Sequence, residues 1–144
     1  MTIQRALVTL FVGMAVLAAG RSASAQTETF KGRLSPVPIE NAARSGITGS
    51  GSVTATLTGR SLTIRGMFSG LQSPATVAQI RLGPRGIRGP VMFDLTVTKA
   101  TNGSISGTLT LTPEQVEAVR RSRFYVQIHS EKAPDGNLWG WLLP

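Results

Sequence analysis

The stretch SVTATLTGRSLTIRGMF, residues 52–68, decides the fold class of this chain. Apolar and polar side chains alternate on both sides of Gly59-Arg60, with Val53 and Leu57 before this pair and Leu62 after it. A period of two places alternate side chains on opposite faces of a β-strand. We therefore predict a β-hairpin with one buried and one exposed face that turns at Gly59-Arg60.

The same alternation, interrupted by turn residues such as Asn102-Gly103, continues along the chain. One helix is expected at about 113–121, because Thr112 and Gln115 form a capping box around Pro113 in the first turn. Short strands of this kind predict an all-β protein, an antiparallel β-sandwich or a barrel, and the period does not choose between them. The expected strands cover residues 30–34, 53–58, 62–68, 77–82, 91–97, 105–111, 124–129 and 138–142.

Residues 1–25 have the pattern of a secretory signal peptide. Arg5 supplies the positive charge, an apolar stretch follows, and small residues precede a cleavage site after Ala25. A transmembrane anchor needs roughly 20 apolar residues, and Arg21 interrupts this stretch too early. We expect cleavage to leave a β domain at 26–144 that is periplasmic or secreted and has no transmembrane anchor.

Composition excludes several classes of site. The 144 residues carry a formal net charge of +8, contain no cysteine and contain a single histidine, His129. A cysteine-based zinc site, a thiolate nucleophile, a disulfide framework and a multi-histidine metal centre are therefore excluded. The chain also lacks a G-x-S-x-G nucleophile motif and closely spaced carboxylates, so we predict no catalytic site. Nucleic acid is a poor candidate ligand, because no aromatic residues are interleaved with the basic ones.

A set of short motifs extends over residues 51–142: TATL (54–57), FSGLQSPAT (68–76), the spaced glycines before Val91, GTLTLTPEQ (107–115), YVQIHS (125–130), and Gly136, Gly140 and Leu142. In their order and spacing they resemble the CHRD domain, the repeat first described in chordin. The resemblance implies an antiparallel β-sandwich or Greek-key barrel that is similar in outline to the copper–zinc superoxide dismutase fold.

The chain departs from the family pattern at its histidines. That pattern has His-Ile-His where this chain has Gln79-Ile80-Arg81, so His129 alone remains of three histidines. An arginine has no lone pair to donate to a cation. We therefore expect neither a metal nor another cofactor. A metal-binding module similar to superoxide dismutase is the alternative reading, and a hydrolase acting on envelope material is a third.

Arg81, Arg85 and Arg88 lie in and beside a glycine-rich segment, 83–90. Arginine side chains on such a loop can bind phosphate or carboxylate groups through two hydrogen bonds. An anionic envelope component or an acidic protein is the partner that this predicts. Two readings of Arg81 are open: it replaces a metal by hydrogen-bonding His129 or Tyr125, or it is a solvated loop charge.

Trp139 and Trp141 are expected on one strand face, opposite Leu138 and Leu142. They either form a partner surface, where aromatic residues are enriched, or are covered by the N-terminal segment or the helix. The leading expectation is an exported, non-enzymatic module with a binding or structural role. Its candidate ligand or partner surface comprises Gln79, Arg81, Arg85, Arg88, Tyr125, Gln127, His129, Trp139 and Trp141.

Overall fold

The hairpin predicted from residues 52–68 is present. In the computed structural model, which describes residues 26–38 and 47–144, strands β2 (Ser50–Thr58) and β3 (Ser61–Ser69) pair antiparallel over their full length. Gly59 turns the chain with a φ of 61°. Val53, Ala55 and Leu57 are buried, and Thr54 and Thr56 between them face outward, so the alternation predicts both faces correctly.

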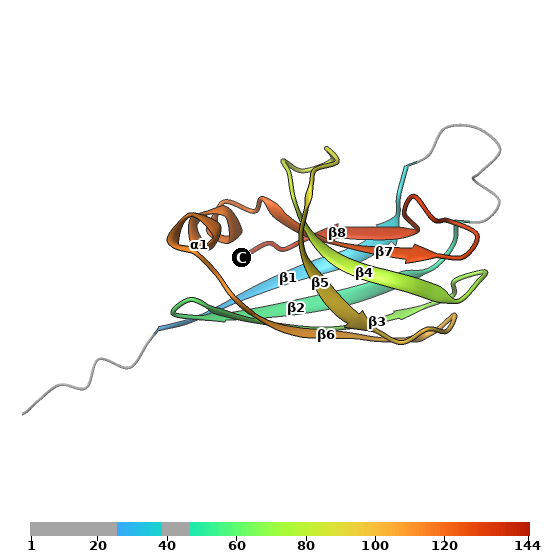
Figure 1. Cartoon of the computed structure of the whole chain (residues 1–144), viewed down its shortest axis with the longest axis horizontal. Helices are drawn as coiled ribbons and strands as arrows, with labels where there is room; N and C mark the ends of the chain where they lie inside the picture. Colours follow the sequence, from blue (N-terminus) through green and yellow to red (C-terminus); the bar gives the residue numbers. More distant parts are fainter. Residues whose placement is uncertain (1–25, 39–46) are drawn as a thin grey trace, which may run out of the picture.

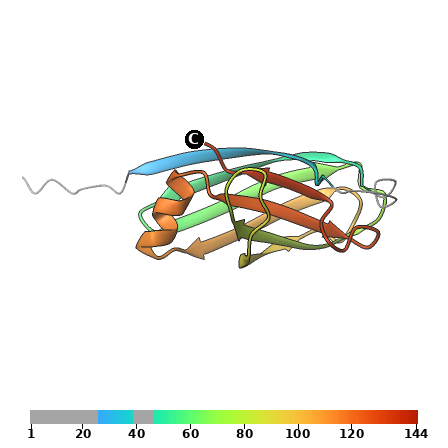
Figure 2. The same ribbon diagram turned by 90° about the horizontal axis from the view of Figure 1, so that it is seen from above.

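These strands belong to a closed antiparallel barrel with the strand order β1-β2-β3-β6-β5-β4-β7-β8 (Figures 1 and 2). β3 lies beside β6 and the meander β4-β5-β6 follows, which is a Greek-key arrangement. β1 pairs with β8 and thereby closes the barrel. The alternation in the sequence is compatible with a β-sandwich and with a barrel, and the structure is a barrel. The remaining elements are β1 (Thr27–Pro36), β4 (Ala75–Leu82), β5 (Val91–Val97), β6 (Gly103–Thr110), α1 (Pro113–Arg120), β7 (Phe124–Ser130) and β8 (Leu138–Trp141).

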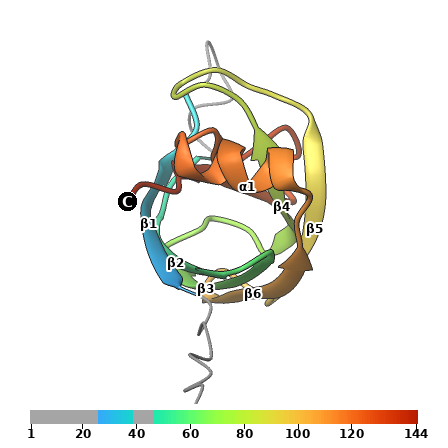
Figure 3. The same cartoon turned by 90° about the vertical axis from the view of Figure 1, so that its left-hand side faces the viewer.

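The hydrophobic core fills the inside of this barrel. Every strand contributes at least one buried apolar side chain, and burial of each such side chain stabilises the fold by ~1.5–3 kcal/mol. The helix α1 lies across one end of the barrel (Figure 3), where Val116 and Val119 join the core. Fully buried residues of the core include Leu34, Leu62, Ile64, Ile80, Phe124, Val126, Ile128, Leu138 and Leu142.

The helix starts as the capping box predicts. The Gln115 backbone N–H donates to Thr112 Oγ1 (3.2 Å), and the Thr112 N–H donates to Gln115 Oε1 (2.9 Å). At the other end, Arg120 forms ion pairs with Glu28 of β1 (3.0 Å) and with Glu117 (3.3 Å). Hydrogen bonds to these two carboxylates raise the pKa of Arg120. The helix is therefore tied to the barrel wall as well as packed on its end.

Two predicted elements differ from those in the structure. β1 is longer than 30–34, because it pairs with β2 from Thr27 onward. Asn102-Gly103 is not a two-residue hairpin turn: residues 98–102 join β5 to β6, and Asn102 Oδ1 accepts a hydrogen bond from the Gly70 N–H (2.9 Å). The predicted signal segment, 1–25, lies outside the described residues. Among the helices of the described ranges, none has the length and apolar character needed to cross a membrane.

Candidate functional site

The outer faces of β4, β7 and β8 bring most of the predicted site residues together. Because side chains alternate along a strand, Phe124, Val126 and Ile128 fill the barrel and the residues between them point outward. The register then aligns Gln79 with Gln127 and Trp139 in one row, and Arg81 with Tyr125 and Trp141 in the next, and it sets His129 opposite Val77. We call this side of the barrel wall the outer face. It carries Gln79, Arg81, Tyr125, Gln127, His129, Trp139 and Trp141.

The three aromatic residues of the outer face form a packed cluster. Tyr125 and Trp141 are stacked with ring centroids 4.4 Å apart, and the Trp139 ring meets each of them edge-on. Tyr125 is fully buried and Trp141 is 9% exposed, whereas Trp139 is half-buried. Trp141 is thus covered, as one of the two readings predicts. Its cover includes the glycine loop, residues 83–90, which lies on the cluster and was not among the predicted covers.

Hydrogen bonds attach the glycine loop to the outer face. Trp141 Nε1 donates to the Gly83 carbonyl (2.9 Å), and the Gly89 N–H donates to the Tyr125 hydroxyl (2.8 Å). A Cβ at Gly89 would overlap the Leu82 carbonyl oxygen, which explains why the loop needs glycine there. On β7, therefore, the outward side chains of Tyr125 and Gln127 are buried, and His129 is half-buried.

The two arginines of the loop differ in role. Arg88 Nη1 donates to the Asp135 carbonyl (3.1 Å) and so ties the loop to the turn that precedes β8. Arg85 is exposed, and it contributes to neither of the two pockets described below. Of the predicted site residues, Arg85 is the one that the structure separates from the others.

Arg81 is half-buried on β4, not on the loop. Its Nε donates to Gln79 Oε1 (3.3 Å) and its Nη1 donates to the Gly89 carbonyl (3.0 Å). Arg81 is therefore not a solvated loop charge; it has a local structural role, as the other reading predicts, but with Gln79 and Gly89 as partners in place of His129 or Tyr125. The Tyr125 hydroxyl instead interacts with the Gly89 backbone. Among the described residues, no carboxylate forms an ion pair with Arg81.

Both ring nitrogens of His129 have hydrogen-bond partners. Nδ1 lies 2.8 Å from the Pro134 carbonyl, which can only accept, so Nδ1 carries the proton. Nε2 then accepts from Gln127 Nε2 (3.3 Å), whose other N–H donates to the Asp135 carbonyl (3.2 Å). This orientation of the Gln127 amide satisfies both of its N–H groups. It leaves Oε1 buried without a hydrogen-bond partner in the described part of the chain.

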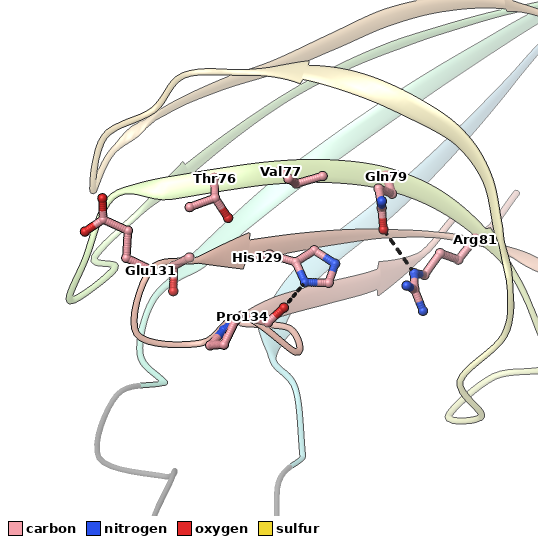
Figure 4. Close-up of a pocket in the computed structure, with 8 residues that line it drawn as sticks. Thr76, Val77, Gln79, Arg81, His129, Glu131 and Pro134 are labelled. Atoms are coloured by element: carbon pink, nitrogen blue, oxygen red, sulfur yellow. Dashed lines mark hydrogen bonds between the residues drawn. The ribbon is translucent and has the colours of Figure 1, made fainter.

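A shallow pocket of about 570 Å³ opens on the outer face (Figure 4). Gln79, Arg81 and His129 all line it, so the three positions at which the family pattern has histidine meet in one place. A second pocket of about 400 Å³ adjoins it and shares Arg81 and His129. Sequence reasoning missed Val77 and Glu131 as lining residues. No motif marks them, because it is the register of β4 and β7 that brings them to the pocket.

The donors present do not fit a metal ion. The Arg81 guanidinium is positively charged and offers no lone pair, and both ring nitrogens of His129 already have partners. In the ranges that the structure describes, no group of three or more histidine, aspartate or glutamate side chains could hold a metal ion. The pocket instead presents hydrogen-bond donors and a positive charge, which suit an anionic group.

Comparison with known proteins identifies the family of this chain. The family model described as CHRD domain matches residues 30–142, which is most of the chain. Neither the curated proteins nor the solved structures gave a match. On the strength of the family match, the chain belongs to the CHRD domain family.

Proposed function

We propose that this protein is an exported, non-enzymatic binding module that holds an anionic group of its partner in the outer-face pocket, at Arg81. The proposal rests on the hydrogen bonds of the Arg81 guanidinium. Two hydrogen bonds fix it, and three of its five N–H groups have no partner among the described residues. A fixed guanidinium loses little side-chain entropy when it binds a carboxylate or phosphate.

The surroundings of Arg81 favour such a ligand. The adjoining pocket is lined by Arg88, so a second positive charge lies beside the first. Charge-assisted hydrogen bonds from arginine to carboxylate or phosphate are roughly twice as strong as neutral ones. An anionic component of the envelope or an acidic protein therefore suits the pocket. Export is proposed on the sequence of residues 1–25.

Two contacts support a binding role in place of catalysis. Ser130, which follows the lone histidine, is buried, and its hydroxyl donates to Asn137 Oδ1 (2.8 Å). His129 has both ring nitrogens in hydrogen bonds and contacts no hydroxyl nucleophile among the residues described. Nucleophilic catalysis needs a hydroxyl or thiol within hydrogen-bond reach of a base. This face of the barrel supplies no such pair.

The test is calorimetric titration with N-acetyl-penta-alanine, whose single charge is its carboxylate. We expect Arg81→Gln to weaken binding about tenfold or more, because a charge-assisted hydrogen bond contributes ~1.5–3 kcal/mol. Arg81→Lys should retain part of the affinity, since it keeps the charge but not the two-pronged geometry. Arg85→Gln removes the same charge from an exposed position outside the pocket and is the matched control.

Equal affinity of Arg81→Gln and the unsubstituted protein would contradict the proposed site. Added salt should weaken binding in the unsubstituted protein, because it screens exposed charges. Turnover of any ester or glycoside that disappears in His129→Ala would contradict the non-enzymatic role.

A further inference from the structure

The outer-face pocket carries opposite charges at its two ends. Arg81 lines one end and Glu131 the other, with His129 between them (Figure 4). Arg81 pairs with Tyr125 near the start of β7, and Ala75 pairs with Ser130 at its end. The six residue steps from Ala75 to Arg81 span about 20 Å of strand. The two charges therefore belong to separate ends of an elongated site.

Neither charge has an ion-pair partner among the described residues. Arg81 hydrogen-bonds to an amide oxygen and a backbone carbonyl, both of which are uncharged. Glu131 is exposed, and in the described ranges no lysine or arginine lies within ion-pair distance of its carboxylate. A ligand with complementary charges at its two ends would meet both.

Between Arg81 and Glu131, the pocket lining has no aspartate, glutamate, lysine or arginine side chain. Val77 is 40% exposed and offers an apolar surface, and Thr76 contributes a hydroxyl group. His129 lies next to them with its proton on Nδ1, which the Pro134 carbonyl accepts. Such a lining suits a chain of small residues with backbone amides, not a second charged group.

We propose that the ligand of this pocket is a short zwitterionic peptide, with its carboxylate at Arg81 and its ammonium group at Glu131. The inference rests on the proposed function, because it keeps the anionic group at Arg81 and adds the opposite end of the ligand. An extended chain of five residues spans at most ~17 Å, which approaches the length of strand between the two charges. Peptides of about this length with free ends are the predicted ligand class.

Three probes of equal length test this assignment by calorimetric titration: penta-alanine, N-acetyl-penta-alanine and penta-alanine amide. In the unsubstituted protein, acetylation of the amino end should weaken binding about fivefold, the upper range for an exposed ion pair. Amidation of the carboxyl end should weaken it about tenfold or more.

The variant Glu131→Gln tests whether Glu131 binds the ammonium group of the peptide. It should bind penta-alanine and its N-acetyl form equally, because the carboxylate that distinguishes them is gone. Glu114→Gln, an exposed helix residue outside the pocket, removes the same charge and should keep the fivefold difference.

The outcomes separate the two proposals. If the unsubstituted protein binds both forms equally while Arg81→Gln weakens both, the zwitterionic ligand is overturned and the anion site stands. A fivefold preference that persists in Glu131→Gln also overturns it, since the ammonium group would then lie elsewhere. Failure of the unsubstituted protein to bind any of the three probes at millimolar concentration overturns both proposals.

Discussion

At the scale of single residues, Gln127 connects the pocket to the turn beside it. Its amide donates to His129 and to the Asp135 carbonyl, and it packs against Gly136. Gly136 has a φ of 130°, and a Cβ there would lie 2.6 Å from Gln127 Nε2. A glycine two residues before β8 thus leaves the space that the Gln127 amide occupies.

We expect Gly136→Ala to lower the free energy of unfolding by about 2–3 kcal/mol, since backbone strain adds to displacement of the Gln127 amide. Chemical denaturation measures this change. Gly86→Ala is the control, because Gly86 also has a positive φ, 81°, but a Cβ there would meet no atom within 4 Å. Its cost should stay near 1 kcal/mol, and equal losses in the two variants would show that the Gln127 contact is unimportant.

The sequence identifies some of the pocket residues, but it does not predict which groups they contact. His129 is conspicuous as the lone histidine, and its position beside Gln79 and Arg81 was expected from the family pattern. Its tautomer was not predictable, because it depends on the Pro134 carbonyl, which a turn brings to the ring. The partners of Arg81 were missed for the same reason: one of them is a backbone oxygen, and residue type carries no signal for that.

At the scale of elements, the glycine loop determines what the outer face exposes. Alternation along β7 and β8 predicts which side chains point out of the barrel. It does not predict that Tyr125 and Trp141 are buried there, because the cover comes from a loop whose contacting residues lie 36 and 58 positions earlier in the chain. The helix was predictable to within one residue, because its capping box is a local signal.

Trp141→Phe tests how the loop is held. The substitution keeps an aromatic ring against Tyr125 but removes the indole N–H that donates to the Gly83 carbonyl. We expect a loss of ~1 kcal/mol in stability and faster amide hydrogen exchange at Gly89. Trp139→Phe is the matched control, since the Trp139 indole N–H has no partner in the described ranges. Unchanged exchange at Gly89 in Trp141→Phe would contradict this role.

At the scale of the whole molecule, the barrel has a core that does not involve a metal ion. Buried aliphatic and aromatic side chains fill it from every strand, and within the described ranges no group of three or more histidine, aspartate or glutamate side chains could hold a metal ion. We therefore expect the thermal midpoint to be the same with a chelator and with added copper or zinc. Scanning calorimetry measures this directly. A rise of several degrees with either metal would favour the superoxide dismutase-like alternative, because a ligand that binds the native state stabilises it.

The measurement that tests the central claim most directly is an NMR titration of the isotope-labelled protein with N-acetyl-penta-alanine. If the pocket holds the carboxylate, the Arg81 Nε–H resonance should shift most, together with the Gln79 side-chain amide that accepts its hydrogen bond. Resonances of Arg65, on the β3 wall outside this pocket, should stay unchanged. Shifts centred on Arg65 or on the helix, with Arg81 unaffected, would contradict the assignment of the outer-face pocket as the binding site.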